Sequence, residues 1–197
     1  RRGMRRAHRR RVRTHVTVHK LERQVITSLA NIKKYTVEMG GGLDFDKTGR
    51  LERIQVQRGT TASVDLPPDF EVQYHTHPAP RGRRAPLASP EDVLALLHDP
   101  AQQAELVVRP GATDILVKSP SIGALSKRPA TRVFSELDGA YTRSQRAPTP
   151  ALADRRWYDE LRKFGLSVET NRNTGPLRIP HVRPVEPSRR ARGARWA

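Results

Sequence analysis

Two histidines one residue apart, His75 and His77, have the spacing in this sequence that most directly indicates chemistry. They stand in VQYHTHPAP, whose aromatic and β-branched residues predict a strand that ends at Pro78. Residues two apart on a strand point the same way and lie about 6.6 Å apart along the backbone, so both imidazoles can approach one ion. The pair is equally compatible with two polar residues that share a strand face.

Any metal site here must use His, Asp or Glu ligands, because the sequence contains no cysteine. Zinc hydrolases typically combine three protein ligands with an open position for water. Asp92 is the candidate third ligand, because the loop before it is long enough to fold it back over the strand end. Ser89 and Asp92 also form a helix capping box, and a capping aspartate needs no metal.

Glu38 is the candidate base. It precedes three glycines, Gly40, Gly41 and Gly42, which allow a neighbouring strand or a substrate to approach closely. Spacing alone does not establish this role.

The elements that must position these residues can be read from periodicity and turn chemistry. Apolar residues three and four apart predict a helix at 20–34, and a capping signal at Ser89 predicts another at 89–99. A third helix is predicted at 151–165, ending at Gly165, before a Pro/Arg-rich tail. Strands are predicted at 34–45, 50–57, 62–67, 70–78, 104–110 and 113–120, with a hairpin turn at 46–49, while 133–143 is ambiguous.

This order predicts an α/β fold of the α+β type, with a mixed, mostly antiparallel sheet flanked by helices. No stretch approaches the roughly 20 apolar residues of a membrane span, and the basic N-terminus lacks the apolar run of a secretory signal. We therefore expect a soluble, intracellular protein without membrane contact. A mitochondrial transit peptide stays open, because residues 1–20 are rich in arginine and free of acids.

Positive charge is concentrated at the two ends of the chain. The 197 residues carry a net charge of +17; residues 1–20 hold nine Lys/Arg and no acid, and 181–197 hold five Arg and one Glu. Such blocks repel themselves and bury little, so we expect them to be disordered until they meet nucleic acid or an acidic protein surface. Solubilising tails or a nuclear address are the alternatives. The arginines expected to make these contacts are Arg5, Arg6, Arg9, Arg10, Arg11, Arg189, Arg190 and Arg192 at the ends, with Arg83 and Arg84 in the loop after the histidines. For that loop a solvated, flexible segment is the alternative.

Taken together, Glu38, HTHP at 75–78 and SPED at 89–92 resemble the JAMM (JAB1/MPN+) motif: a glutamate, then His-x-His-Pro, then Ser-x-x-Asp. The resemblance covers roughly residues 20–120. The sequence around the motif resembles JAB domains of large DNA viruses and prokaryotes more than the eukaryotic proteasome-associated members. It implies an MPN-like fold and a zinc-dependent hydrolase of peptide or isopeptide bonds, acting on peptides or ubiquitin-like proteins.

The resemblance also implies a role for each motif residue. His75, His77 and Asp92 would be the Zn²⁺ ligands, Glu38 the general base acting on zinc-bound water, and Ser89 a hydrogen-bond donor to the developing oxyanion. The loop at 78–88 is longer than is usual in the family and contains three arginines. Since a ubiquitin-like C-terminal tail is itself basic, this loop is expected to repel such a tail.

These expectations divide the chain into a basic arm at 1–19, a JAMM-like domain at 20–145, a C-terminal helix and extension at 146–180 and a basic tail at 181–197. The main alternative is a structural MPN-fold protein of a virion or other nucleoprotein particle that needs no catalysis. A nucleic-acid binder without enzymatic function is the third hypothesis, although no helix-turn-helix, zinc finger or aromatic RNA-binding signature is visible.

Overall fold

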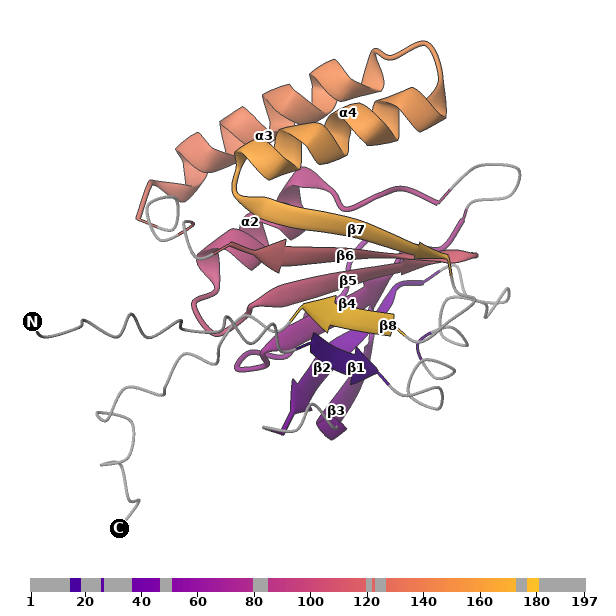
Figure 1. Cartoon of the computed structure of the whole chain (residues 1–197), viewed down its shortest axis with the longest axis vertical. Helices are drawn as coiled ribbons and strands as arrows, with labels where there is room; N and C mark the ends of the chain where they lie inside the picture. Colours follow the sequence, from indigo (N-terminus) through magenta and orange to yellow (C-terminus); the bar gives the residue numbers. More distant parts are fainter. Residues whose placement is uncertain are drawn as a thin grey trace, which may run out of the picture.

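The computed structural model describes residues 15–18, 26, 37–46, 51–79, 85–119, 122, 127–172 and 177–180. Within these ranges the chain forms a six-stranded, mostly antiparallel sheet that packs against helices, together with a separate two-stranded sheet (Figure 1). The predicted α+β class, with a mixed sheet flanked by helices, is confirmed.

The main sheet has the strand order β3-β2-β4-β5-β6-β7. Neighbouring strands are antiparallel except β4 and β5, which are parallel and are joined through α2. A parallel pair requires such a crossover, and this one starts α2 close to the carboxyl end of β4. The elements of the crossover and the sheet are β2 (Met39–Phe45), β3 (Leu51–Arg58), β4 (Val72–Thr76), α2 (Pro90–His98), β5 (Ala104–Arg109), β6 (Ala112–Lys118) and β7 (Leu166–Arg172).

Helices cover one face of this sheet. With α2, the pair α3 (Ala130–Gln145) and α4 (Pro150–Lys163) encloses an apolar core that contains Trp157 and Val107. Tyr74 of β4 belongs to the second core, on the opposite face. Because side chains alternate along a strand, His75 faces the helices. None of the described helices combines the length and apolarity that a membrane span requires.

The other face is covered in part by a two-stranded sheet. Its strands, β1 (His15–Val18) and β8 (Leu177–Pro180), are antiparallel, with His15 opposite Pro180. Leu177 and Ile179 are buried in the second core together with Ile26. The helix predicted at 20–34 otherwise lies outside the described residues, and Ile26 itself is helical.

Several predicted elements are confirmed. The hairpin has Met39 opposite Arg58 and Phe45 opposite Leu51. At the start of α2, both hydrogen bonds of the capping box between Ser89 and Asp92 are present. The helix predicted at 151–165 is α4, and the strands predicted at 70–78, 104–110 and 113–120 are β4, β5 and β6.

The strand predicted at 62–67 is wrong. This segment begins in a turn that the Thr60 side chain closes by accepting the N–H of Ser63. It ends at Pro67 and Pro68, which cannot donate to a sheet ladder. The side chains of its apolar residues pack over Gly40 instead.

The region after residue 130 is more ordered than the sequence suggested. The ambiguous stretch 133–143 lies within α3, and the segment after Gly165 contains β7 and β8 rather than only a tail. Leu166 and Val168 are buried in the same core as the helices, so β7 completes the main sheet. Its alternation of apolar and polar residues was a strand signal that the prediction did not use.

The predicted segment boundaries therefore cut across the fold. The boundary at 145/146 separates α3 from α4, although Leu137 and Trp157 of these helices share one core. The arm at 1–19 includes β1, so residues 15–18 are part of the folded structure rather than disordered. Residues 1–14 and the tail at 181–197 lie outside the described residues.

The glycines of β2 that pair with β4 are required by close packing within the chain. A Cβ on Gly41 would lie 1.8 Å from the carbonyl oxygen of Gln55, and one on Gly42 would lie 2.1 Å from Cγ of Phe70. The Tyr74 hydroxyl crosses Gly41 to donate to the Gln55 carbonyl, at 3.2 Å. The sequence left open whether a neighbouring strand or a substrate approaches these glycines. At Gly41 the neighbouring strand β3 occupies the space.

We expect Gly42→Ala to lower the free energy of unfolding by about 1–3 kcal/mol, because the new methyl group must displace the buried Phe70 ring. Gly139→Ala in α3 is the matched control. There the nearest atom to a new Cβ is the flexible Arg143 Nη1 at 3.4 Å, so we expect a gain of roughly 0.5–1 kcal/mol. Urea unfolding measures both; equal effects of the two substitutions would contradict this account.

Candidate metal centre

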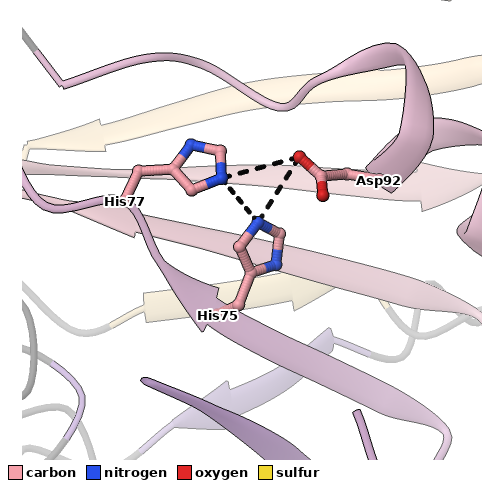
Figure 2. A group of neighbouring side chains, drawn as sticks. All are labelled: His75, His77 and Asp92. Atoms are coloured by element: carbon pink, nitrogen blue, oxygen red, sulfur yellow. Dashed lines mark hydrogen bonds and ion pairs between the residues drawn. The ribbon is translucent and has the colours of Figure 1, made fainter. Parts of the chain in front are cut away.

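The side chains of His75, His77 and Asp92 converge on one point (Figure 2). Their ligand atoms all lie within 4.8 Å of one another. The two Nε2 atoms are 2.9 Å apart, and Asp92 Oδ2 lies 3.5 Å from that of His75 and 3.6 Å from that of His77. Three atoms that carry lone pairs repel one another at these distances unless a proton or a cation lies among them.

The three distances fit a small divalent metal ion. Tetrahedral zinc ligands about 2.0–2.1 Å from the ion lie about 3.3 Å from one another, and the observed separations of 2.9, 3.5 and 3.6 Å bracket that value. Two imidazoles and one carboxylate suit zinc, and the same set suits iron(II). The cluster can therefore hold a divalent transition metal.

Backbone pairing fixes the two histidines. His75 is in β4, opposite Gly40 on one side and Val107 on the other. His77 lies just beyond the strand, but its N–H still donates to the carbonyl of Val108 at 2.9 Å, which keeps the alternation of side chains. Both imidazoles are buried and point to the helix-covered face.

Asp92 is held by the start of α2. Its Oδ2 accepts the backbone N–H of Ser89 at 2.7 Å, and its own N–H donates to Ser89 Oγ at 3.2 Å. The capping box and the metal cluster thus share one carboxylate, so the two interpretations of Asp92 do not exclude each other.

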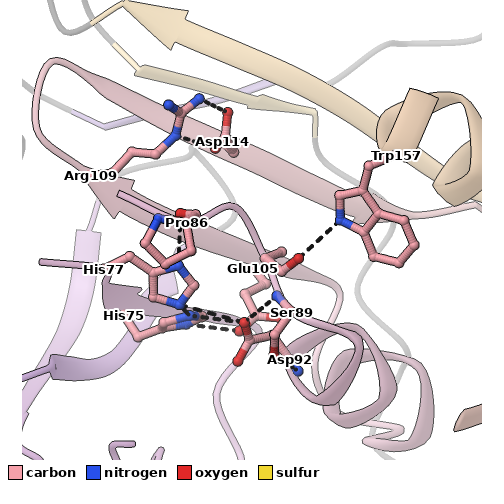
Figure 3. A network of polar contacts seen from close by, with 10 residues as sticks. His75, His77, Pro86, Ser89, Asp92, Glu105, Arg109, Asp114 and Trp157 are labelled. Carbon is pink, nitrogen blue, oxygen red and sulfur yellow. Dashed lines mark hydrogen bonds and ion pairs between the residues drawn. The ribbon is translucent and has the colours of Figure 1, made fainter. Parts of the chain in front are cut away.

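The Nδ1 atoms of the two imidazoles have different partners (Figure 3). His77 Nδ1 lies 3.0 Å from the carbonyl oxygen of Pro86. His75 Nδ1 lies 3.0 Å from Oε1 of the buried Glu105, close enough for an ion pair although the ring N–H does not point straight at that oxygen. With a proton on each Nδ1, both Nε2 atoms present lone pairs to the point of convergence.

Charge and burial shift the pKa of each group in the cluster. Burial lowers the pKa of His75, but Asp92 and Glu105 outweigh it and leave that pKa well above its ordinary value. Burial and the neighbouring His75 lower the pKa of His77. Burial would raise the pKa of Asp92, yet the two imidazoles and the Ser89 N–H hold it far below its ordinary value. In the metal-free cluster these shifts favour a proton on His75 over one on His77 or Asp92.

Glu38, the predicted base, lies next to this cluster without belonging to it. It immediately precedes β2, where its N–H donates to Thr60 and its carbonyl accepts from Gly59. Burial raises the pKa of its carboxyl, and the charges of His75 and Asp92 also act on it. A half-buried carboxylate with a raised pKa close to a cluster of ligand-type side chains is a candidate for proton transfer.

Sequence reasoning missed four groups around the site, which are Pro86, Glu105, the Arg109–Asp114 pair and Trp157 (Figure 3). Arg109 donates two hydrogen bonds to Asp114, at 2.6 and 3.0 Å. Trp157 donates to the carbonyl of Ala88 at 2.9 Å and so fixes the segment before Ser89. Glu105 gave a usable signal, because an acid directly before the apolar run LVV of a strand is unusual unless it is paired.

The predicted contact arginines are not described by the structure. Arg83 and Arg84 lie in the undescribed part of the loop between β4 and α2, and the arginines of both ends lie outside the described ranges. Their assignment stays a prediction.

Neither protein-family models, nor curated proteins, nor solved structures give a match to this chain. The function must therefore be argued from the site itself.

We expect zinc binding to strengthen as the pH rises. The raised pKa of His75 means that the metal-free cluster holds a proton above the ordinary imidazole pKa of about 6.5, and zinc must displace it. The lowered pKa values of His77 and Asp92 mean that these groups have no proton to lose there. About one proton should leave per zinc bound.

The measurement is the zinc-induced rise in Tm, which at 100-fold excess over Kd should reach about 5–10 °C for a chain of this size. The rise should be larger at about pH 8 than at about pH 6. A rise that is independent of pH, or that shrinks as the pH increases, would contradict the assignment of the proton to His75.

Proposed function

We propose that this chain is a JAMM-type, zinc-dependent hydrolase of peptide or isopeptide bonds. The observation that carries the proposal is the convergence of His75, His77 and Asp92 on one point, with the half-buried Glu38 beside them. Residues from three separate parts of the sequence supply a ligand set, a base and a hydrogen-bond donor in the order of the motif.

In this proposal His75, His77 and Asp92 hold zinc. Bound there, zinc would act as a Lewis acid toward a substrate carbonyl group and would make water more acidic. The protein's own contribution begins with the burial of the two imidazoles, which keeps bulk water away from the ligands. Low polarity around the site strengthens every charge interaction within it.

Glu38 acts as the proton carrier. Its carboxylate removes a proton from the attacking water and delivers it to the nitrogen that leaves when the amide bond breaks. Burial raises the pKa of this carboxyl above that of an exposed glutamate, which suits a group that must both accept and release a proton near neutral pH.

Ser89 stabilises the negative charge that develops on the carbonyl oxygen. Its Oγ already accepts the N–H of Asp92, so its own O–H proton stays available to donate. It also stands at the N-terminus of α2, where the aligned peptide dipoles favour negative charge. Both features place a donor and a positive potential beside the ligand Asp92.

We expect Glu38→Gln to lower peptide hydrolysis by about 10²- to 10⁴-fold while zinc binding persists, because the base is removed and the ligands are not. The readout is cleavage of a fluorogenic peptide library and of a lysine-branched isopeptide by zinc-loaded full-length protein, with metal content measured in parallel. Glu91→Gln is the matched control: Glu91 is exposed and lies next to Asp92 in the first turn of α2.

Three outcomes separate the hypotheses. Loss of hydrolysis only in Glu38→Gln supports the enzyme. Zinc binding without hydrolysis in the unsubstituted protein supports the alternative, a structural protein with a bound metal. Absence of any divalent transition metal after purification and reconstitution contradicts the proposal altogether.

Polyanion binding is a second candidate function, and the register of the small sheet favours it. His15 lies opposite Pro180, and opposing residues of an antiparallel pair are about 4.5–5.5 Å apart. The segments 1–14 and 181–197 are therefore attached to the small sheet at neighbouring residues. They carry eight Arg without an acid and five Arg with one Glu, respectively. Two basic segments joined at one point raise each other's effective concentration on one nucleic acid.

We expect the double substitutions Arg9→Gln with Arg10→Gln, and Arg189→Gln with Arg190→Gln, to weaken binding to duplex DNA. Each should reduce the slope of log Kd against log salt concentration by up to about 2, because binding releases about one counterion fewer for each phosphate contact that is lost. The matched control replaces Arg155 and Arg156, an exposed pair on α4. An equal loss in this control would show that only net charge matters and would contradict a role for the ends.

A further inference from the structure

Glu105 is a buried carboxylate that no step so far requires. It lies in β5, is only 1% exposed and is surrounded by the apolar residues of that strand. Its Oε1 lies 3.0 Å from His75 Nδ1, whereas its Oε2 is buried without a hydrogen bond. A buried carboxylate with an unsatisfied oxygen is costly, and an apolar residue of similar size would cost less. Stability alone therefore does not explain it.

The parallel pairing of β4 and β5 sets the position of Glu105. His75 is opposite Val107 and Gln73 is opposite Glu105, one step further along the face that the helices cover. Because side chains two apart on a strand share a face, Glu105 reaches His75 diagonally from the neighbouring strand. The contact depends on the sheet and not on a loop.

Glu105 contacts His75 at the ring nitrogen that does not face the point of convergence. Nε2 of the ring lies 2.9 Å from His77 Nε2 and 3.5 Å from Asp92 Oδ2, whereas Nδ1 lies 3.0 Å from Glu105 Oε1, within ion-pair distance although its N–H is not aimed straight at that oxygen. A proton on Nδ1 leaves the Nε2 lone pair free for a ligand, and a carboxylate is the strongest acceptor for that proton.

We propose that Glu105 is a positioning residue for the metal centre, which holds the His75 ring by its Nδ1 and makes its Nε2 a stronger donor to the ion. This inference rests on the proposed function, since it requires His75 to be a metal ligand. It adds a residue that lies outside the motif and does not touch substrate.

The two histidine ligands are then unequal. His77 has the neutral carbonyl oxygen of Pro86 at its Nδ1, whereas His75 has a carboxyl oxygen of Glu105, whose pKa is raised by burial and lowered by the neighbouring His75 charge. An anionic partner withdraws the Nδ1 proton more strongly and increases the electron density at Nε2. His75 is therefore the stronger electron-pair donor to the ion of the two histidines, and Glu105 of β5 determines how strong it is.

The test compares Glu105→Gln and Glu105→Leu in the full-length protein. Zinc Kd is measured by competition with a chromophoric chelator, and the visible absorption bands of the Co²⁺-loaded protein report the ligand field. We expect Glu105→Leu to raise Kd for zinc by about 10- to 100-fold and to shift the Co²⁺ bands. Glu105→Gln should have a smaller effect, because its amide oxygen still accepts a proton from Nδ1.

Thermal unfolding of the metal-free variants separates positioning from folding. We expect Glu105→Leu to be at least as stable as the unsubstituted protein, so that metal affinity falls while metal-free Tm does not. Glu169→Gln and Glu169→Leu, at an exposed strand position of β7, are the matched controls and should leave zinc Kd unchanged.

Each outcome decides the question. A zinc Kd within about twofold of the unsubstituted value in both Glu105 variants overturns this inference and leaves the proposed function intact, because loss of the carboxylate at His75 Nδ1 should raise Kd by more than that. A loss of affinity matched by loss of the metal-free fold also overturns it. Failure of the unsubstituted protein to bind zinc or Co²⁺ overturns the proposed function, and this inference with it.

Discussion

The parallel pairing of β4 with β5 is the constraint on which the rest of the site depends. Because two parallel strands cannot be joined by a tight turn, the chain leaves β4, forms α2 and returns as β5. This path puts the first turn of α2, with Asp92, at the strand end that carries His75 and His77. The same pairing places Glu105 behind His75. The pairing of β4 with β5 thus sets the positions of the His75, His77 and Asp92 cluster and of Glu105.

The cluster and its neighbours occupy buried positions beside the apolar core, where apolar side chains would stabilise the fold more than polar ones. His75, Glu105 and Asp114 are buried on the helix-covered face, beside the core that contains Trp157. Asp114 has full compensation, since Arg109, Tyr158 and Thr170 all donate to it. His75 and Glu105 have less, because each keeps one buried atom without a hydrogen bond. The contrast separates a structural ion pair from groups whose arrangement suits a bound cation.

The sequence predicted those parts of the site that depend on local chemistry. The capping box at Ser89 and the shared face of His75 and His77 follow from short-range rules and are confirmed. Glu105 and the carbonyl of Pro86 could not be placed in this way, because their contacts with the histidines depend on which strands pair and where a loop closes. The strand predicted at 62–67 failed for a related reason: β propensity does not reveal that the side chains of Val64 and Leu66 pack over Gly40.

The hydrogen bond from Trp157 to the carbonyl of Ala88 spans 69 residues of sequence. A ribosome adds about 5–20 residues per second, so Ala88 is synthesised about 3–14 s before the indole that holds it. During most of that interval the nascent chain already contains both imidazoles and the Asp92 carboxylate, but neither Trp157 nor β7. The three side chains of the cluster therefore exist during translation before the core that buries them.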